Sequence, residues 1–110
     1  MKDNSFFLKH ILDSIRRIRR YLDGVTFEEF VKDEMRVGAT VRELEIIGEA
    51  ASKLDMDFCA SHPEVQWQKM ISMRNFLIHQ YFGVSEKVVW GTYKNDLDEL
   101  EKEIMSLLQG

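Results

Sequence analysis

Apolar residues recur at intervals of three and four along almost the whole chain, and this spacing constrains the fold more than any other feature. One stripe predicts a first helix ending before Gly24, and a second predicts a long helix from about Asp33. The stripes are Leu8, Ile11, Ile15, Ile18 and Leu22, and then Val37, Val41, Leu44, Ile47, Ala51 and Leu54. No segment alternates with the period of a β-strand. The sequence predicts an all-α fold, an antiparallel up-and-down helical bundle.

Local signals set the expected helix boundaries. Thr26-Phe27-Glu28-Glu29 has the pattern of a capping box that opens a short helix. Residues 55–66 are expected to form a connector, because Pro63 disfavours helix continuation from His62. A third long helix is expected from about 67 to 81, ending at Gly83, and Ser85 is suited to cap the next one.

Composition limits the classes of protein that remain. The 110 residues predict one domain, residues 1–110, and 45% apolar with 31% charged residues is typical of a globular protein. A net charge of −4 argues against coating nucleic acid by bulk electrostatics. The apolar runs are too short to cross a membrane. A single cysteine, Cys59, and a start without the pattern of a secretory signal predict a cytoplasmic location.

The segment Arg74-Asn75-Phe76-Leu77-Ile78-His79-Gln80-Tyr81 places a cation, an imidazole and a phenol in an otherwise apolar helix. Burying such groups without partners is costly, so their presence favours a function. Arginine binds phosphate through a planar fork, and histidine transfers protons near neutral pH. Asn75 and His79 share a helix face, whereas Arg74 and His79 diverge by about 140°. A helix-end pocket or a second chain could bring Arg74 and His79 together.

This segment resembles the R-x4-H-x-Y signature of HEPN-superfamily ribonucleases, specifically the HepT-type toxins. The resemblance extends over Leu44-Glu45-Ile46-Ile47-Gly48-Glu49-Ala50 and over Val89-Trp90…Asn95-Asp96-Leu97. It implies a homodimeric HEPN-like helical domain and an endoribonuclease toxin of a type II/VII-like toxin–antitoxin module. It also implies an antitoxin partner with a minimal nucleotidyltransferase (MNT-type) fold, which silences the toxin by adenylylating Tyr81.

On this hypothesis Arg74 and His79 are catalytic, with no metal and no cofactor. His79 would transfer protons and Arg74 would stabilise charge on the phosphorane, giving a 2′,3′-cyclic phosphate and a free 5′-hydroxyl. Asn75 would position His79 or a phosphate oxygen, and Glu49 would support the site by orienting Arg74. Gly48 would allow its helix to approach a neighbour closely. One such histidine per chain leaves either the acid or the base missing, which favours a dimer with an RNA groove at its interface.

The sequence leaves open two interpretations of the basic cluster and an alternative function. The basic cluster Arg16, Arg17, Arg19 and Arg20 is either a solvated face offset by Asp13, Asp23 and nearby acids, or a surface for RNA or a partner protein. His10, His62, His79 and Cys59 lack the spacing of a zinc site, and a phosphate-binding glycine-rich loop is missing. The alternative function is a non-catalytic, substrate-binding subunit of a two-component nucleotidyltransferase.

Overall fold

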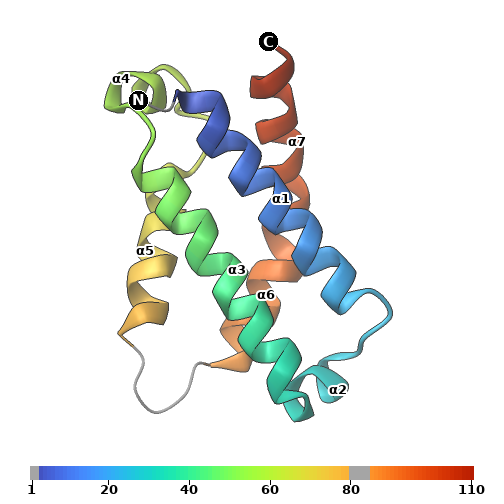
Figure 1. Cartoon of the computed structure of the whole chain (residues 1–110). Coiled ribbons are helices and arrows are strands. Elements are labelled where there is room, and N and C mark those ends of the chain that lie inside the picture. The colour runs from blue at the N-terminus through green and yellow to red at the C-terminus, as the bar shows by residue number, and fades with distance from the viewer. Residues whose placement is uncertain (1–2, 80–84) are drawn as a thin grey trace.

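The computed structural model describes residues 3–79 and 85–110, and every regular element in these ranges is a helix. The helices are α1 (Asn4–Leu22), α2 (Phe27–Lys32), α3 (Glu34–Ser52), α4 (Met56–Ser61), α5 (Trp67–Ile78), α6 (Glu86–Asn95) and α7 (Leu97–Gln109). In Figure 1, α1 descends, α3 returns, α5 descends again, and α6 with α7 leads back up. The predicted all-α fold, with its antiparallel up-and-down order, is confirmed.

Helix α3 is the central element of the bundle. It packs against α1 along one side and against α5 along another, while α7 packs on α1 and α6 (Figure 1). This arrangement follows from the two apolar stripes, which bury their residues between α1, α3 and α7. All five predicted stripe residues of α1 are buried.

The predicted caps form as the sequence indicates. Thr26 and Glu29 make both hydrogen bonds of the capping box, at 2.9 and 3.1 Å. Ser85 accepts a hydrogen bond from the backbone N–H of Val88 and caps α6. Gly24, with φ of 74°, adopts the left-handed conformation just after α1. These short-range signals therefore set where three helices begin or end.

Two predicted boundaries were wrong. The connector from 55 to 66 contains the short helix α4, whose six residues are too few to show a period. Asn4 fixes its start by accepting a hydrogen bond from the backbone N–H of Asp55 at 3.1 Å. Helix α5 ends at Ile78, earlier than expected, and His79 caps it in a turn. The predicted stop at Gly83, like Tyr81, lies outside the described residues.

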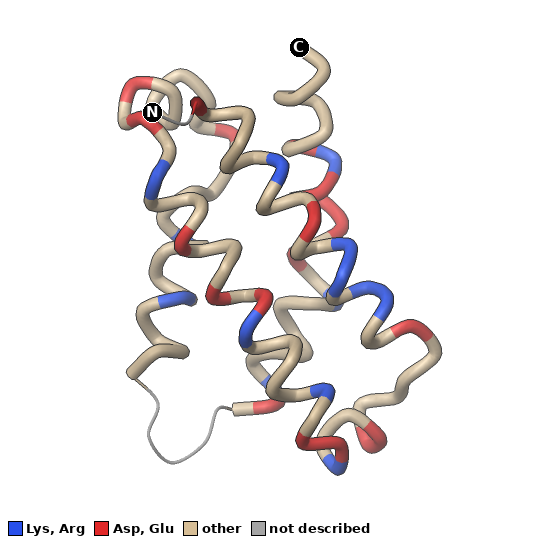
Figure 2. Tube along the Cα trace, in the orientation of Figure 1, with Lys and Arg blue, Asp and Glu red and all other residues tan. Residues whose placement is uncertain are grey.

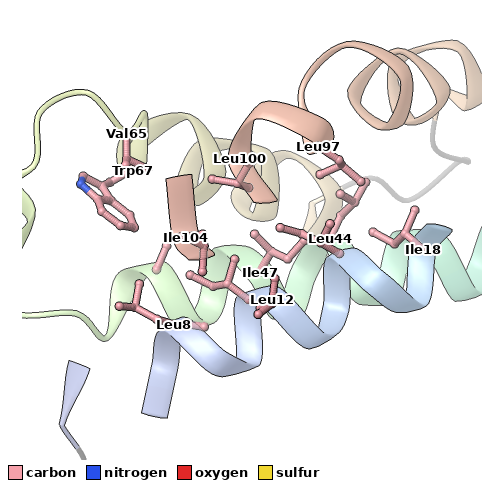
Figure 3. Packing of buried hydrophobic residues seen from close by; sticks show 14 of the residues in the cluster. Leu8, Leu12, Ile18, Leu44, Ile47, Val65, Trp67, Leu97, Leu100 and Ile104 are labelled. Atoms are coloured by element: carbon pink, nitrogen blue, oxygen red, sulfur yellow. The ribbon is translucent and has the colours of Figure 1, made fainter. Parts of the chain in front are cut away.

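The core is a continuous apolar cluster between α1, α3, α5 and α7. Figure 3 shows Leu8 and Leu12 of α1 pointing toward Ile47 of α3 and Ile104 of α7. Trp67 closes one end and donates its indole N–H to the carbonyl of His62 at 3.0 Å. Among the described helices, none is both long and apolar enough to cross a membrane.

Candidate active site

Arg74 lies on α5 against α3, where its guanidinium forms an ion pair with the carboxylate of Glu49. The Arg74 side chain is 20% exposed and that of Glu49 is 51% exposed. Lys53 also contacts Glu49, with 3.7 Å between the ammonium nitrogen and a carboxylate oxygen. The structure thus brings together Arg74 and Glu49, two of the residues that the sequence nominated.

Gly48 makes this arrangement possible. A Cβ added at Gly48 would overlap the Cβ of Arg74 and lie 2.6 Å from the carbonyl oxygen of Met70. Only glycine therefore lets α3 approach α5 this closely. The expected role of Gly48 is confirmed, and Arg74 itself is the residue at the contact.

His79 and Asn75 lie apart from Arg74 on the exposed side of α5. Both are exposed, and the backbone N–H of His79 donates to the carbonyl of Asn75 at 3.3 Å. Among the residues that the structure describes, none forms a hydrogen bond or ion pair with the His79 imidazole. Asn75 and His79 are thus exposed at the end of α5, while Arg74 is held against α3. Tyr81 lies outside the described residues.

A groove of about 400 Å³ runs over α3 beside Arg74. One stripe of α3 forms its floor, and α1 and α5 form its walls. The floor residues are Arg42, Glu45, Ile46, Glu49, Ala50 and Lys53, and the wall residues are Phe6, Phe7, His10, Arg74 and Ile78. Arg42 contacts Glu45 at 3.8 Å. The groove thus combines cationic, acidic and aromatic groups around Arg74.

Comparison with known proteins identifies the family of this chain. The family model described as Ribonuclease HepT-like matches residues 11–107, nearly the whole chain. The chain belongs to the HepT-like ribonuclease family. The resemblance inferred from the 74–81 segment is confirmed at this level.

Two relatives illustrate how closely this HepT-like chain matches known sequences. "Putative RNase TTE0752" of Caldanaerobacter subterraneus subsp. tengcongensis is 41% identical over 109 residues, covering 99% of this chain and 97% of the relative. "Probable ribonuclease HepT" of Thermococcus cleftensis is 40% identical over 101 residues, covering 92% of each chain. No solved structure matches the chain.

In this HepT-like chain the basic cluster of α1 is largely paired within the fold. Arg16 and Arg19 contact Glu101 of α7 at 3.4 and 2.9 Å, and Arg19 also pairs with Asp98. Arg17 contacts Glu43 of α3 at 3.3 Å. The acids that pair with these arginines are distant in sequence. The expectation that Asp13 and Asp23 would balance the charge of the cluster was therefore wrong. Figure 2 shows the acidic positions of α7 beside the basic end of α1.

Glu43 is a buried acid that the sequence analysis missed. It is 7% exposed, and it accepts hydrogen bonds from Arg17 and from the Tyr21 hydroxyl at 3.3 and 3.4 Å. Glu43 lies within the apolar period of α3, one residue before Leu44, and this position was the signal that could have identified it as buried. Arg20 is exposed, and no ion pair of Arg20 is found among the described residues.

A second, smaller cavity of about 110 Å³ lies between α3, α5, α6 and α7, away from Arg74. Lys69 and Asp96 bridge its rim at 3.2 Å. Burial, then the neighbouring carboxylates of Glu99 and Glu64, raises the pKa of Glu103 there. Within residues 3–79 and 85–110, no group of three or more His, Cys, Asp or Glu side chains is arranged to hold a metal ion.

Proposed function

We propose that this protein is a metal-independent endoribonuclease toxin that uses Arg74 and His79. The observation that carries the proposal is Arg74, held by Glu49 on the wall of an open groove, with His79 exposed at the end of the same helix. Membership of the HepT-like ribonuclease family supports the same activity. Arginine and histidine together supply phosphate binding and proton transfer, the two elements that RNA cleavage requires.

The proposed reaction is internal transesterification of RNA. The 2′-oxygen attacks the adjacent phosphorus as an imidazole removes its proton, and the bond from phosphorus to the 5′-oxygen breaks as that oxygen gains a proton. The products are a 2′,3′-cyclic phosphate and a free 5′-hydroxyl. Arg74 stabilises the charge that builds up on the phosphorane oxygens. Asn75, one helical turn before His79, orients the imidazole or a phosphate oxygen.

The active unit on this proposal is a symmetric homodimer with the two α5 helices facing each other. Helix α5 packs mainly on α3 and leaves two apolar side chains exposed, Phe76 at 41% and Ile78, on the groove wall, at 55%. A second copy would cover these apolar side chains and supply a second imidazole, so that one could act as base and the other as acid. Sedimentation at micromolar concentration tests this, since a fully active monomer would refute the dimer.

Adenylylation of Tyr81 by a nucleotidyltransferase antitoxin is the proposed means of control. Tyr81 follows His79 by two residues, so an adenylyl group there would bring a negative charge close to the catalytic histidine. That charge would occupy Arg74 and repel RNA phosphate. Intact-mass measurement after co-expression with the antitoxin tests the site. A Tyr81→Phe protein that still gains adenylyl mass would show that another residue is the acceptor.

The activity is tested with purified protein and RNA. We expect Arg74→Ala and His79→Ala each to slow cleavage by about 10²–10⁴-fold while the thermal midpoint shifts little. His62→Ala and Arg20→Ala are the matched controls, because both residues lie outside the groove. If the wild-type protein leaves RNA intact, the non-catalytic subunit of a nucleotidyltransferase becomes the better description. Unfolding of both the Arg74→Ala and the His79→Ala protein would assign the motif a structural role.

A further inference from the structure

We propose that Phe6 and His10 form a stacking platform for a base of single-stranded RNA beside the phosphate bound by Arg74. This inference rests on the proposed function and adds a substrate-binding subsite to it. The platform is the α1 wall of the groove described above, opposite the α5 wall that carries Arg74.

The two rings are already arranged for stacking. Phe6 and His10 lie one helical turn apart on α1, with ring centroids 4.3 Å apart and planes inclined by 40°. Phe7 contacts Phe6 edge to face at 5.1 Å. His10 is exposed, so its ring is supported by Phe6 on one side and accessible on the groove side. A pre-ordered aromatic surface loses little conformational entropy when a base stacks on it.

Core packing does not require the His10 ring. The buried residues of α1 near His10 are Leu8, Ile11 and Leu12, and Figure 3 shows Leu8 and Leu12 on the face toward α3 and α7. His10 lies off this stripe, and leucine or lysine there would leave the core unchanged. An exposed imidazole packed on a phenylalanine inside a groove therefore fits ligand contact better than stabilisation of the bundle.

The charges of the groove suit a polyanion with accessible bases. Arg42, Lys53 and Arg74 contribute three cations, and Glu45 and Glu49 contribute two carboxylates, so the groove has a formal charge of +1 in a chain of net charge −4. An acidic peptide would gain the same cations but would leave the aromatic wall unused.

Cations beside an aromatic wall favour the binding of single-stranded RNA over duplex RNA. Unpaired bases stack on aromatic side chains, while paired bases are already stacked within their helix. The α1 and α5 walls lie on opposite sides of α3, and each packs about 8–10 Å from it. A phosphate at Arg74 and a base at His10 would therefore belong to one strand that crosses the groove.

The test measures binding of labelled single-stranded RNA by fluorescence anisotropy in an uncleaving His79→Ala background. We expect the added His10→Ala change to weaken binding about ten-fold, within the range found when a stacking ring is removed. His10→Phe should retain the affinity, because it keeps the ring without the imidazole. Lys9→Ala, at a neighbouring exposed position of α1, is the control and should change affinity little.

An abasic nucleotide moved along the same RNA separates stacking from other effects. At one position it should weaken binding to the His79→Ala protein about as much as His10→Ala does, and it should cost nothing further in the double variant. Equal penalties for His10→Ala on intact and abasic RNA would overturn the platform. So would a changed sedimentation coefficient with unchanged RNA affinity, which would make this wall a contact between copies.

Failure of the subsite and failure of the proposed function give different results. If wild-type protein cleaves RNA but His10→Ala binds it normally, only the platform is wrong. If wild-type protein neither binds nor cleaves RNA, both proposals are wrong.

Discussion

Two arginine-containing regions of this molecule behave in opposite ways. We call the first the α1 seam, formed by Arg16, Arg17 and Arg19 with Glu43, Asp98 and Glu101. In the seam each arginine has a carboxylate from another helix, so its charge is used inside the fold. In the groove Arg74 shares the half-exposed Glu49 with Lys53, and the surrounding surface stays open.

The difference teaches that the density of charge along a sequence does not locate a binding site. The seam contains the densest basic run in the chain, yet its charges hold α1 to α3 and α7. The groove gathers single cations from α3 and α5 that are far apart in sequence. The fold matches the three arginines of the seam with three carboxylates, whereas the three cations of the groove share the two carboxylates of Glu45 and Glu49. This balance of charge decides which region is available to an anionic ligand.

The largest effect on stability is expected at Gly48, which sets the distance between α3 and Arg74. In Gly48→Ala the new methyl group would overlap Arg74 and crowd the Met70 carbonyl, so we expect a loss of about 1–3 kcal/mol in unfolding free energy, with reduced RNA cleavage. Gly38→Ala on the same helix is the control, since nothing lies within 4 Å of its added Cβ. That control should be stabilised by about 0.5–1 kcal/mol. Urea unfolding measures both, and equal stability of the two variants would contradict the close approach.

A smaller loss is expected when the buried acid of the seam is removed. Glu43→Ala leaves Arg17 and the Tyr21 hydroxyl without their acceptor, but the Arg17 side chain is 41% exposed and can be hydrated. The change should therefore cost about 0.5–1.5 kcal/mol while specific activity of the folded protein is retained. Glu45→Ala is the matched control for stability, because Glu45 lies on the groove floor and contacts Arg42 at 3.8 Å. If Glu43→Ala is as stable as the wild type, the desolvation of Glu43 cancels its contacts, and the seam contributes no stability.

The smallest effect is expected for the exposed part of the seam. Arg19→Ala removes contacts to Asp98 and Glu101, but the Arg19 side chain is 40% exposed, so the loss should stay within about 0–1 kcal/mol and shrink in salt. RNA affinity should match that of Arg20→Ala. A drop in affinity as large as that of Arg74→Ala would show that the seam binds RNA and would remove the contrast between the two regions.

Much of the fold was predictable because it depends on short-range patterns. The stripe of α1, the Thr26 capping box and the Ser85 cap each involve residues within a few positions of one another. The close approach at Gly48 was also predictable, because a glycine inside an apolar helical stripe has few other uses. Helix α4 was missed because six residues show no period, and the end of α5 was placed too late because apolar residues continue to Ile78 and beyond.

Part of the candidate site was predictable from local patterns. The motif predicts Arg74 and His79 as site residues, and the contact between Arg74 and Glu49 was expected from the sequence. The acids that pair with Arg16, Arg17 and Arg19 could not be predicted, because they lie 26 to 85 positions away along the chain. The aromatic wall of Phe6 and His10 reaches the groove only through the packing of α1 on α3, which no local pattern encodes.

The dependence of α5 on α3 has a consequence for how the molecule opens. A helix that packs mainly on one neighbour can detach from it without melting the remaining core, so its amide hydrogens exchange through a local opening of lower free energy than global unfolding. We expect the amides of α1 and α3, whose apolar side chains form most of the core, to exchange through openings of higher free energy. The helix that carries Arg74 depends on one interface, with α3, so the opening of that interface alone would separate this arginine from Glu49.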